Sequence, residues 1–110
     1  MSALVFVVCE AQTGESWSEV AAFEHGSARH LLALLEAAEL SGRGWPPELG
    51  VSARAGQQEA QVFGATFVMG PELALLAAED DDPVTLRAWQ AFARIYEDAG
   101  AAVRVVLWFL

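Results

Sequence analysis

A chain of 110 residues in which 55% are hydrophobic is long enough to bury the core of one domain, 1–110, without metal or disulfide support. Fifteen acidic residues against six basic ones give a net charge of −9, which repels nucleic acid and acidic lipid headgroups and favours basic protein partners. The charge therefore argues against direct binding to nucleic acid or to a membrane surface. The short N-terminal apolar run lacks the features of a signal peptide or membrane span, so we expect a cytoplasmic protein.

The first elements are expected to form a hairpin. Leu4–Cys9 is a β-branched, continuously apolar run, which is typical of a strand buried on both faces. Gln12–Gly14 is expected to turn the chain. Trp17–Phe23 alternates only in part, and we interpret it as a second strand paired with the first, with a loop as the alternative.

A helix is predicted from Ser27, which can cap it, through Leu40, because the leucines and alanines between them share one broad face. Ser41-Gly42 is expected to end this helix, and Arg43–Glu48 is expected to be a loop because of its two prolines. Trp45 lies in that loop, where a tryptophan suits either an interface anchor or a plug that packs back on the domain.

The middle of the chain is predicted to contain two strands. Leu49–Ala55 alternates apolar and polar residues, as a strand with one buried face does. Ala60–Met69 is apolar on both faces, and Gly64 within it marks either a bulge or a close backbone approach. Pro71 and Glu72 suit the start of a short helix, which we expect to end at Ala78.

The last quarter of the chain predicts a long helix followed by a strand. Asp82 can cap the helix and Pro83 fits its first position, while the aromatic and apolar residues that follow recur at helical spacing. Gly100 supplies a left-handed stop, and Ala102–Leu110 is an almost unbroken apolar strand.

These elements predict an α+β fold with an antiparallel sheet of four to five strands and two main helices on one face. The arrangement is ferredoxin-like or related: βαββαβ with an extra N-terminal hairpin strand. In that topology the first strand and Ala60–Met69 are central. The other sheet face would be apolar and open, so we expect it to be covered by homodimerisation or by the Trp17 segment folding over it.

Cys9, His25 and His30 are the only soft ligands or nucleophilic partners in the chain. Neither Cys-x-x-Cys nor His-x-x-x-His spacing occurs, so no metal site is expected, and no cofactor motif is present. We expect Cys9 to be an inert core residue and both histidines to lie at the surface, with a Cys–His dyad as the alternative. Glu24 beside His25 suits an acid–base pair less well than a polar approach to the Ser27 cap.

Arg87 and Arg94 are expected on one face of the last helix. They suit an anion clamp, but Glu97 and Asp98 follow Arg94 by three and four residues, so ordinary pairing along the helix surface is favoured.

The acidic run Glu79–Asp82 is the sharpest local feature. Four consecutive carboxylates repel one another and resist burial, so they are expected at the surface. One interpretation is purely structural: a solvated loop in which Asp82 caps a helix. The functional interpretation is a patch that mimics phosphates and docks on a basic groove of another protein. The run lacks the spacing of a calcium loop.

Small size, acidity and the absence of a catalytic motif favour a non-catalytic protein–protein inhibitor that acts as a DNA mimic on a basic nucleic-acid-binding enzyme. An immunity protein against a nuclease toxin and a phage-type, anti-CRISPR-like inhibitor of a defence effector are both of this class. The residues expected to contact the partner are Glu72, Glu79, Asp80, Asp81 and Asp82, with Trp45 as an anchor.

A second hypothesis comes from a different class: a small dimeric α+β ligand-binding protein or enzyme. Its pocket would lie between the sheet and the helices. The open sheet face motivates it, as do Cys9, His25 and His30 if they converge.

Overall fold

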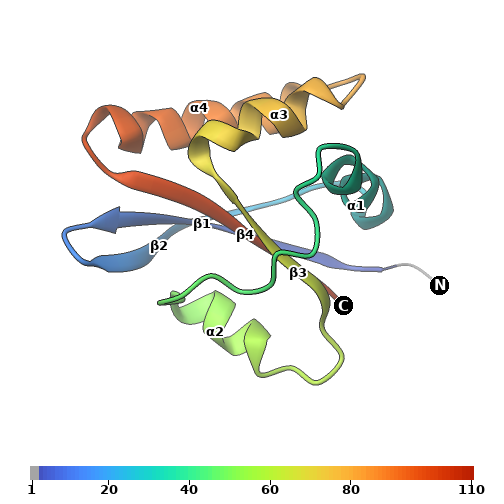
Figure 1. Ribbon diagram of the computed structural model, residues 1–110, viewed down its shortest axis with the longest axis horizontal. Coiled ribbons are helices and arrows are strands. Elements are labelled where there is room, and N and C mark those ends of the chain that lie inside the picture. Colours follow the sequence, from blue (N-terminus) through green and yellow to red (C-terminus); the bar gives the residue numbers. More distant parts are fainter. Residues whose placement is uncertain (1–2) are drawn as a thin grey trace.

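The computed structural model describes residues 3–110, which form a four-stranded antiparallel sheet with helices on both faces (Figure 1). The strand order is β2-β1-β4-β3. A single turn of 3-10 helix at Gly70–Glu72 leads into α3. The elements in chain order are β1 (Val5–Thr13), β2 (Ser16–Phe23), α1 (Ala28–Ala37), α2 (Val51–Gln57), β3 (Phe63–Met69), α3 (Leu73–Ala78), α4 (Val84–Asp98) and β4 (Ala102–Phe109).

The predicted α+β class with an antiparallel sheet is confirmed, and the architecture is compatible with a ferredoxin-like type of fold. The N-terminal hairpin is present: β2 pairs with β1 from Val7 opposite Phe23 to Thr13 opposite Ser16. The prediction that Ala60–Met69 is central is wrong, because β1 and β4 occupy the centre and β3 is an edge strand. Every residue of β4 from Val103 to Phe109 is buried, as a central strand with helices on both faces requires.

The predicted strand Leu49–Ala55 is also wrong, because this segment forms α2. Ala53 and Gly56 are buried three residues apart, on one side of α2, and Leu49, which precedes the helix, is buried in the same cluster as Ala53. An alternating pattern of so few residues also fits helical spacing, and the alanine, arginine and glutamine residues of the segment favour a helix.

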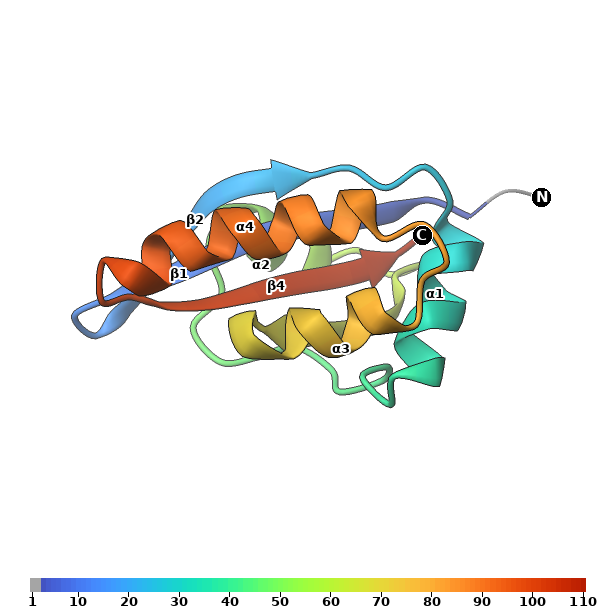
Figure 2. The same ribbon diagram turned by 90° about the horizontal axis from the view of Figure 1, so that it is seen from above.

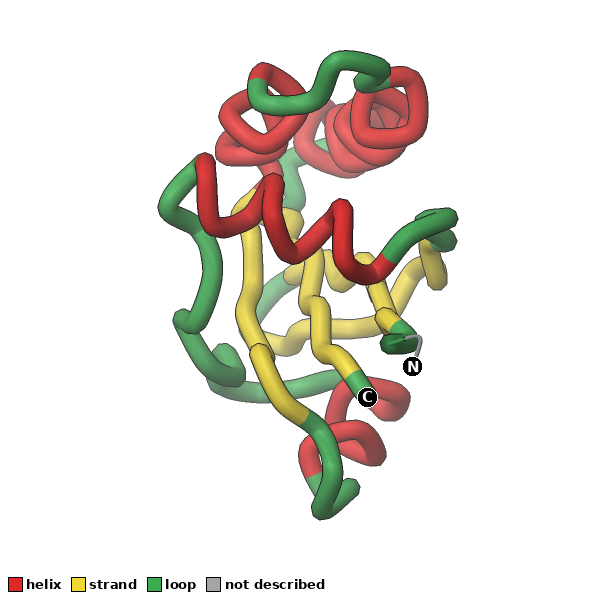
Figure 3. The backbone as a smooth tube through the Cα atoms, turned by 90° about the vertical axis from the view of Figure 1, so that its right-hand side faces the viewer, coloured by secondary structure: helices red, strands yellow, loops and turns green. Residues whose placement is uncertain are grey.

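The helices divide between the two faces of the sheet, as Figures 1 and 3 show. We call the side of α1, α3 and α4 the three-helix face. Its buried cluster takes inward-facing residues of β1 and β4, such as Cys9 and Val105. We call the other side the α2 face; its smaller buried cluster comprises Val8, Leu49, Ala53, Val106 and Trp108.

The predicted open face is therefore covered by α2 and by the loop of Trp45, which packs against the α2-face cluster. The Trp17 segment does not fold over this face, because it lies within the sheet as part of β2. Homodimerisation through the face stays a prediction, but its premise, a wholly open face, does not hold.

The sheet has two edges, and the chain treats them differently. Along β3 the loop after α1 bonds to the outer edge: Gly44 N donates to Ala65 O at 2.9 Å and Arg43 Nη1 donates to Phe67 O at 3.2 Å. The Thr66 hydroxyl, which is buried, donates to Leu40 O at 2.6 Å. Within residues 3–110, β2 at the other edge pairs only with β1.

Several predicted local signals are confirmed. Ser27 Oγ accepts a hydrogen bond from His30 N at 3.1 Å and caps α1. Gly100 has φ +94°, and Ala101 N donates to Tyr96 O as α4 ends. Gly64 has φ +65° and lies at a bulge in the pairing of β3 with β4.

Two predicted helix ends are wrong. Asp82 does not cap α4, which begins at Val84; its backbone N–H instead donates to Asp80 Oδ1 at 3.1 Å. The first helix ends before the predicted Ser41-Gly42, because Glu39 adopts φ +60° and Leu40 N donates back to Leu35 O. Glutamate here takes the left-handed position that glycine usually occupies.

Candidate functional site

The acidic run forms the connection between α3 and α4 and lies beside the N-terminal half of α1 (Figure 2). We call Glu79, Asp80, Asp81 and Asp82 the acidic turn. Glu79, Asp81 and Asp82 are exposed, whereas Asp80 is half-buried. The surface position that mutual repulsion of these carboxylates predicts is therefore observed for Glu79, Asp81 and Asp82, whereas the side chain of Asp80 is only 7% exposed.

Asp80 holds the acidic turn in place. Its Oδ1 accepts hydrogen bonds from Asp82 N at 3.1 Å and from His30 Nε2, on α1, at 3.3 Å. The pKa of Asp80 is lowered, first by the backbone hydrogen bond from Asp82 and further by His30. One carboxylate thus fixes the turn internally and ties it to α1.

The two histidines come together at the same place. The ring centroids of His25 and His30 are 6.0 Å apart, and the His25 ring also lies 6.0 Å from that of Trp89. His25 Nδ1 lies 3.2 Å from Ser27 N and 3.1 Å from Ser27 O, so its partner is Ser27 and not Glu24. Burial lowers the pKa of His25, and the backbone contact with Ser27 opposes that shift.

The remaining three carboxylates of the acidic turn, those of Glu79, Asp81 and Asp82, form no ion pair or hydrogen bond with residues 3–110. Their charges are consequently not compensated within this part of the chain. Such carboxylates are free to pair with cationic groups of another molecule.

The structure places Glu72 and Trp45 away from the acidic turn. Glu72, at the start of α3, pairs with Arg43 through two contacts of 2.7 Å and accepts from Met69 N at 3.0 Å. The pKa of Glu72 is lowered, chiefly by its hydrogen bonds from Arg43. Trp45 is half-buried on the α2 face, with its ring 5.4 Å from that of Trp108. Partner contact by these two residues stays a prediction, although both have internal roles.

Cys9 does not join the histidines in a shared site. It is fully buried in β1, and burial, followed by the nearby charges of Glu10 and Glu97, raises its pKa to about 12. The thiol is therefore neutral and inert. Among residues 3–110, no group of three or more histidine, cysteine, aspartate and glutamate side chains is arranged to hold a metal ion. The second hypothesis, a ligand-binding protein or enzyme with a pocket between the sheet and the helices, thus loses one of its two motives, the convergence of Cys9 with the histidines; the hypothesis itself stays a prediction.

A buried ion pair, not predicted from the sequence, joins β1 and β4. Glu10 and Arg104 lie opposite each other in β1 and β4, and both are at most 2% exposed. Arg104 Nε donates to Glu10 Oε1 at 2.8 Å, and Gly50 N donates to Glu10 Oε2 at 2.7 Å. Arg104 Nη2 reaches the carbonyls of Pro47 and Glu48 at 2.8 and 3.1 Å. The pair therefore ties the chain before α2 to the centre of the sheet.

Trp17 completes this arrangement, because its ring lies 4.0 Å from the guanidinium carbon of Arg104, within the range of a cation–π contact. A signal was present in the sequence: each of two apolar strands contains one charge, of opposite sign, and charged residues are seldom fully buried unless paired. We interpret the ion pair as structural and not as part of a docking surface, because both side chains are buried.

No protein-family model, curated protein or solved structure matches this chain. Within residues 3–110, every helix is too short or too polar to cross a membrane. The geometry by itself thus defines an α+β domain with an acidic turn braced against a helix.

Proposed function

We propose that the protein is a non-catalytic inhibitor that places its acidic turn in the basic nucleic-acid-binding groove of another protein. A nuclease toxin neutralised by an immunity protein, or a defence effector blocked by a phage-type inhibitor, fits this class of partner. The observation that carries the proposal is that Glu79, Asp81 and Asp82 are exposed and lack partners within the described chain.

The charge density of the acidic turn supports mimicry of a nucleic acid. Four consecutive acidic residues concentrate negative charge in one short segment, as successive phosphates do along a DNA strand. Lysine and arginine side chains that bind phosphates also bind carboxylates through charge-assisted hydrogen bonds.

The internal contacts of Asp80 add a second argument. A turn already held by Asp82 N and His30 loses less conformational freedom on binding than a free loop does. The net charge of −9 would steer the protein towards a basic partner and make association depend strongly on salt.

The test begins with the tagged protein in a nuclease-treated bacterial lysate, at low and at high salt, with captured proteins identified by mass spectrometry. We expect a basic nuclease or nucleic-acid-binding effector that is retained at low salt and released at high salt. The association rate of that partner is then measured with a variant combining Glu79→Gln, Asp81→Asn and Asp82→Asn, which keeps the bracing Asp80.

The matched control combines Glu15→Gln, Glu36→Gln and Glu59→Gln, three exposed carboxylates outside the acidic turn. We expect the turn variant to slow association by about tenfold at low salt and to flatten its salt dependence, with a smaller effect in the control. Equal effects in the two variants would reduce the interaction to net charge and refute the acidic turn as its site.

A further inference from the structure

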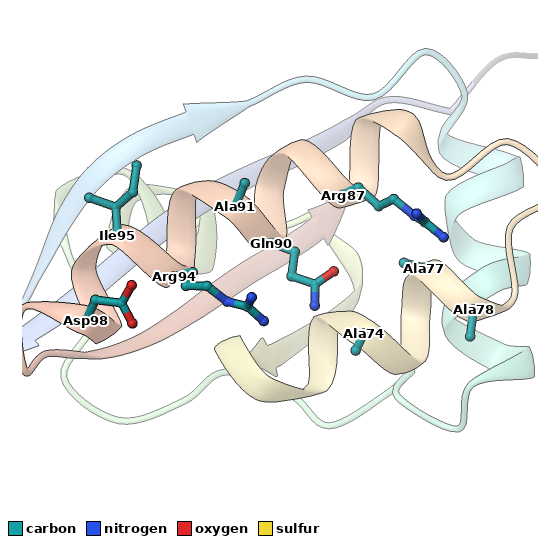
Figure 4. A pocket seen from close by; sticks show the side chains of 9 residues that line it. All are labelled: Ala74, Ala77, Ala78, Arg87, Gln90, Ala91, Arg94, Ile95 and Asp98. Atoms are coloured by element: carbon teal, nitrogen blue, oxygen red, sulfur yellow. The ribbon is translucent and has the colours of Figure 1, made fainter.

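A second surface lies on the outer side of α3 and α4. A groove of about 560 Å³ runs between these helices (Figure 4). Alanine side chains provide much of its lining, and Arg87, Gln90 and Arg94 project from α4 towards α3 in Figure 4. We call this surface the α3–α4 groove; it is lined by Ala74, Ala77, Ala78, Arg87, Gln90, Ala91, Arg94, Ile95 and Asp98.

Arg87 and Arg94 differ from the arginines that hold the fold together. Arg43 and Arg104 form ion pairs, and Arg54 donates to Leu49 O at 2.8 Å. Neither Arg87 nor Arg94 forms an ion pair or hydrogen bond with residues 3–110, so the predicted pairing of Arg94 with Glu97 or Asp98 is not observed. An acidic protein therefore exposes, on one side of one groove, two arginines without an ion-pair partner in the described chain, and Asp98 is the one acidic residue among the described residues that line the groove.

The same helix has apolar side chains on its outer surface. Leu86, Trp89 and Ala93 are buried on the core side of α4. Roughly opposite them, Val84, Ala88, Ala91 and Ile95 recur at intervals of four, three and four residues, and Val84 and Ile95 are 72% and 68% exposed. Such spacing is that of a helix–helix seam. On α3, Leu75 is 56% exposed, so exposed apolar side chains occur on both helices.

We propose that the α3–α4 groove binds an acidic amphipathic helix of a partner protein. Apolar side chains of that helix would contact the alanines and Ile95, and two of its carboxylates would pair with Arg87 and Arg94. Seven residues separate the two arginines, which corresponds to about 10.5 Å along a helix. Carboxylates one heptad apart on the bound helix have the same spacing.

Charge complementarity selects this occupant over two others. A single small anion is poorly matched to two guanidinium groups whose Cα atoms are two helical turns apart. A second copy of the chain, paired through antiparallel α4 helices about Ala91, would place Arg87 of one copy near Arg94 of the other. Like charges so placed oppose association, whereas carboxylates at those positions favour it.

This inference concerns a different surface from the acidic turn and the opposite sign of charge. A basic partner on the turn and an acidic helix on the groove can therefore be tested separately. Substitutions at Arg87 and Arg94 change the groove without replacing a carboxylate of the acidic turn, and their side chains are exposed and outside the core.

The probe is a synthetic 21-residue helical peptide with an alanine and leucine seam and two glutamates seven residues apart, labelled for fluorescence anisotropy. A second peptide carries lysines in place of the glutamates. We expect the glutamate peptide to bind the full-length protein at least tenfold more tightly, and the difference to shrink as salt is added. Absence of measurable binding, or equal binding of the two peptides, would overturn the proposal.

Charge reversal provides the second arm. In Arg87→Glu combined with Arg94→Glu, the preference should invert towards the lysine peptide, while circular dichroism confirms an intact fold. Arg29→Glu, at an exposed arginine of α1, is the control and should leave the preference unchanged. Sedimentation of the protein alone tests the other occupant: a dimer that Ile95→Glu disrupts would assign the groove to a second copy and refute the acidic helix.

Discussion

Between the sheet and α1, α3 and α4 the buried side chains are apolar, apart from the Thr66 hydroxyl and its bond to Leu40 O. Between the sheet and α2, a buried ion pair lies near a much smaller apolar cluster. The packing of the three-helix face is thus stabilised mainly by its buried apolar surface area. The α2 face is stabilised by a few hydrogen bonds and an ion pair from Glu10 and Arg104.

The difference shows how a short, weak helix can be held on a sheet. Only two of the seven residues of α2, Ala53 and Gly56, are buried. The N-cap residue of the helix, Gly50, makes no side-chain hydrogen bond. Isolated helices of this length are unstable in water, so α2 depends on its attachments. Gly50, bonded to Glu10, lies immediately before α2 and provides one of them.

The largest loss of stability is expected when one partner of the buried ion pair is removed. Arg104→Met leaves Glu10 buried without its cation and should lower the free energy of unfolding by about 3–5 kcal/mol. Combining it with Glu10→Leu should recover much of this loss, because no buried charge then remains. Urea denaturation of the three proteins measures both steps; a double variant as unstable as Arg104→Met would show that the contacts to the loop, not the charge, dominate.

A smaller effect is expected where α2 touches the sheet. At Gly56 a Cβ would lie 2.5 Å from Trp108 Cε2, so Gly56→Ala must displace the indole or the helix. The expected loss is about 1–3 kcal/mol of unfolding free energy, despite the better helix propensity of alanine. Gly26→Ala, where a Cβ would meet nothing within 4 Å, is the control. Thermal denaturation and tryptophan emission report the change; a stabilised Gly56→Ala variant would contradict the close approach.

The three-helix face offers a pH test through Cys9. Because its pKa is raised from 9.0 to about 12, the unfolded chain loses the thiol proton first as the pH rises above 9.0. The neutral buried thiol thus contributes stability that is complete below pH 9.0 and lost towards pH 12, with a decrease of roughly 1 kcal/mol at pH 10. Cys9→Ala should remove this part of the alkaline decline in urea denaturation; an identical decline in both proteins would contradict burial as the cause.

The smallest effects are expected at two strained residues, one on each face. Glu39 follows α1 and Glu48 precedes α2, and both have φ +60°. Glu39→Gly should raise the free energy of unfolding by about 0.5–1 kcal/mol, because glycine adopts this conformation without the Cβ penalty. Glu48→Gly should raise the free energy of unfolding by less, because Arg104 Nη2 already fixes this backbone by donating to Glu48 O. Thermal denaturation compares them, and a loss of stability at Glu39→Gly would exclude backbone strain there.

Much of the fold was predictable from the sequence because its signals are local. Ser27 caps its helix, Gly100 ends α4, and the apolar run of β1 forms a central strand, although the second central strand is β4 and not the predicted Ala60–Met69. The segment 49–55 failed because its alternation fits both periods, and its choice of helix depends on contacts with Val106 and Trp108, far away in sequence. That long-range packing overrides a short pattern is expected.

In the candidate site, too, the features with a local cause could be predicted, and those that depend on long-range contacts could not. Exposure of Glu79, Asp81 and Asp82 followed from their mutual repulsion. The contact of Asp80 with His30 joins residues fifty positions apart, and no local pattern indicates it. Arg94 illustrates the converse: a favourable local spacing to Asp98 predicted a pair that the side chains do not form.

The unequal edges of the sheet bear on how the protein behaves at high concentration. The outer edge of β3 is occupied by Arg43 and Gly44, whereas β2 offers its outer edge to any other extended chain. Glu19 lies within β2, and Glu15 and Glu24 flank it, so two such edges meet with like charges. We therefore expect these glutamates to oppose edge-to-edge association, and replacing Glu15 and Glu24 with threonine should lower solubility while keeping the hydrogen bond that Glu19 accepts from Ser52 of α2 at 3.1 Å.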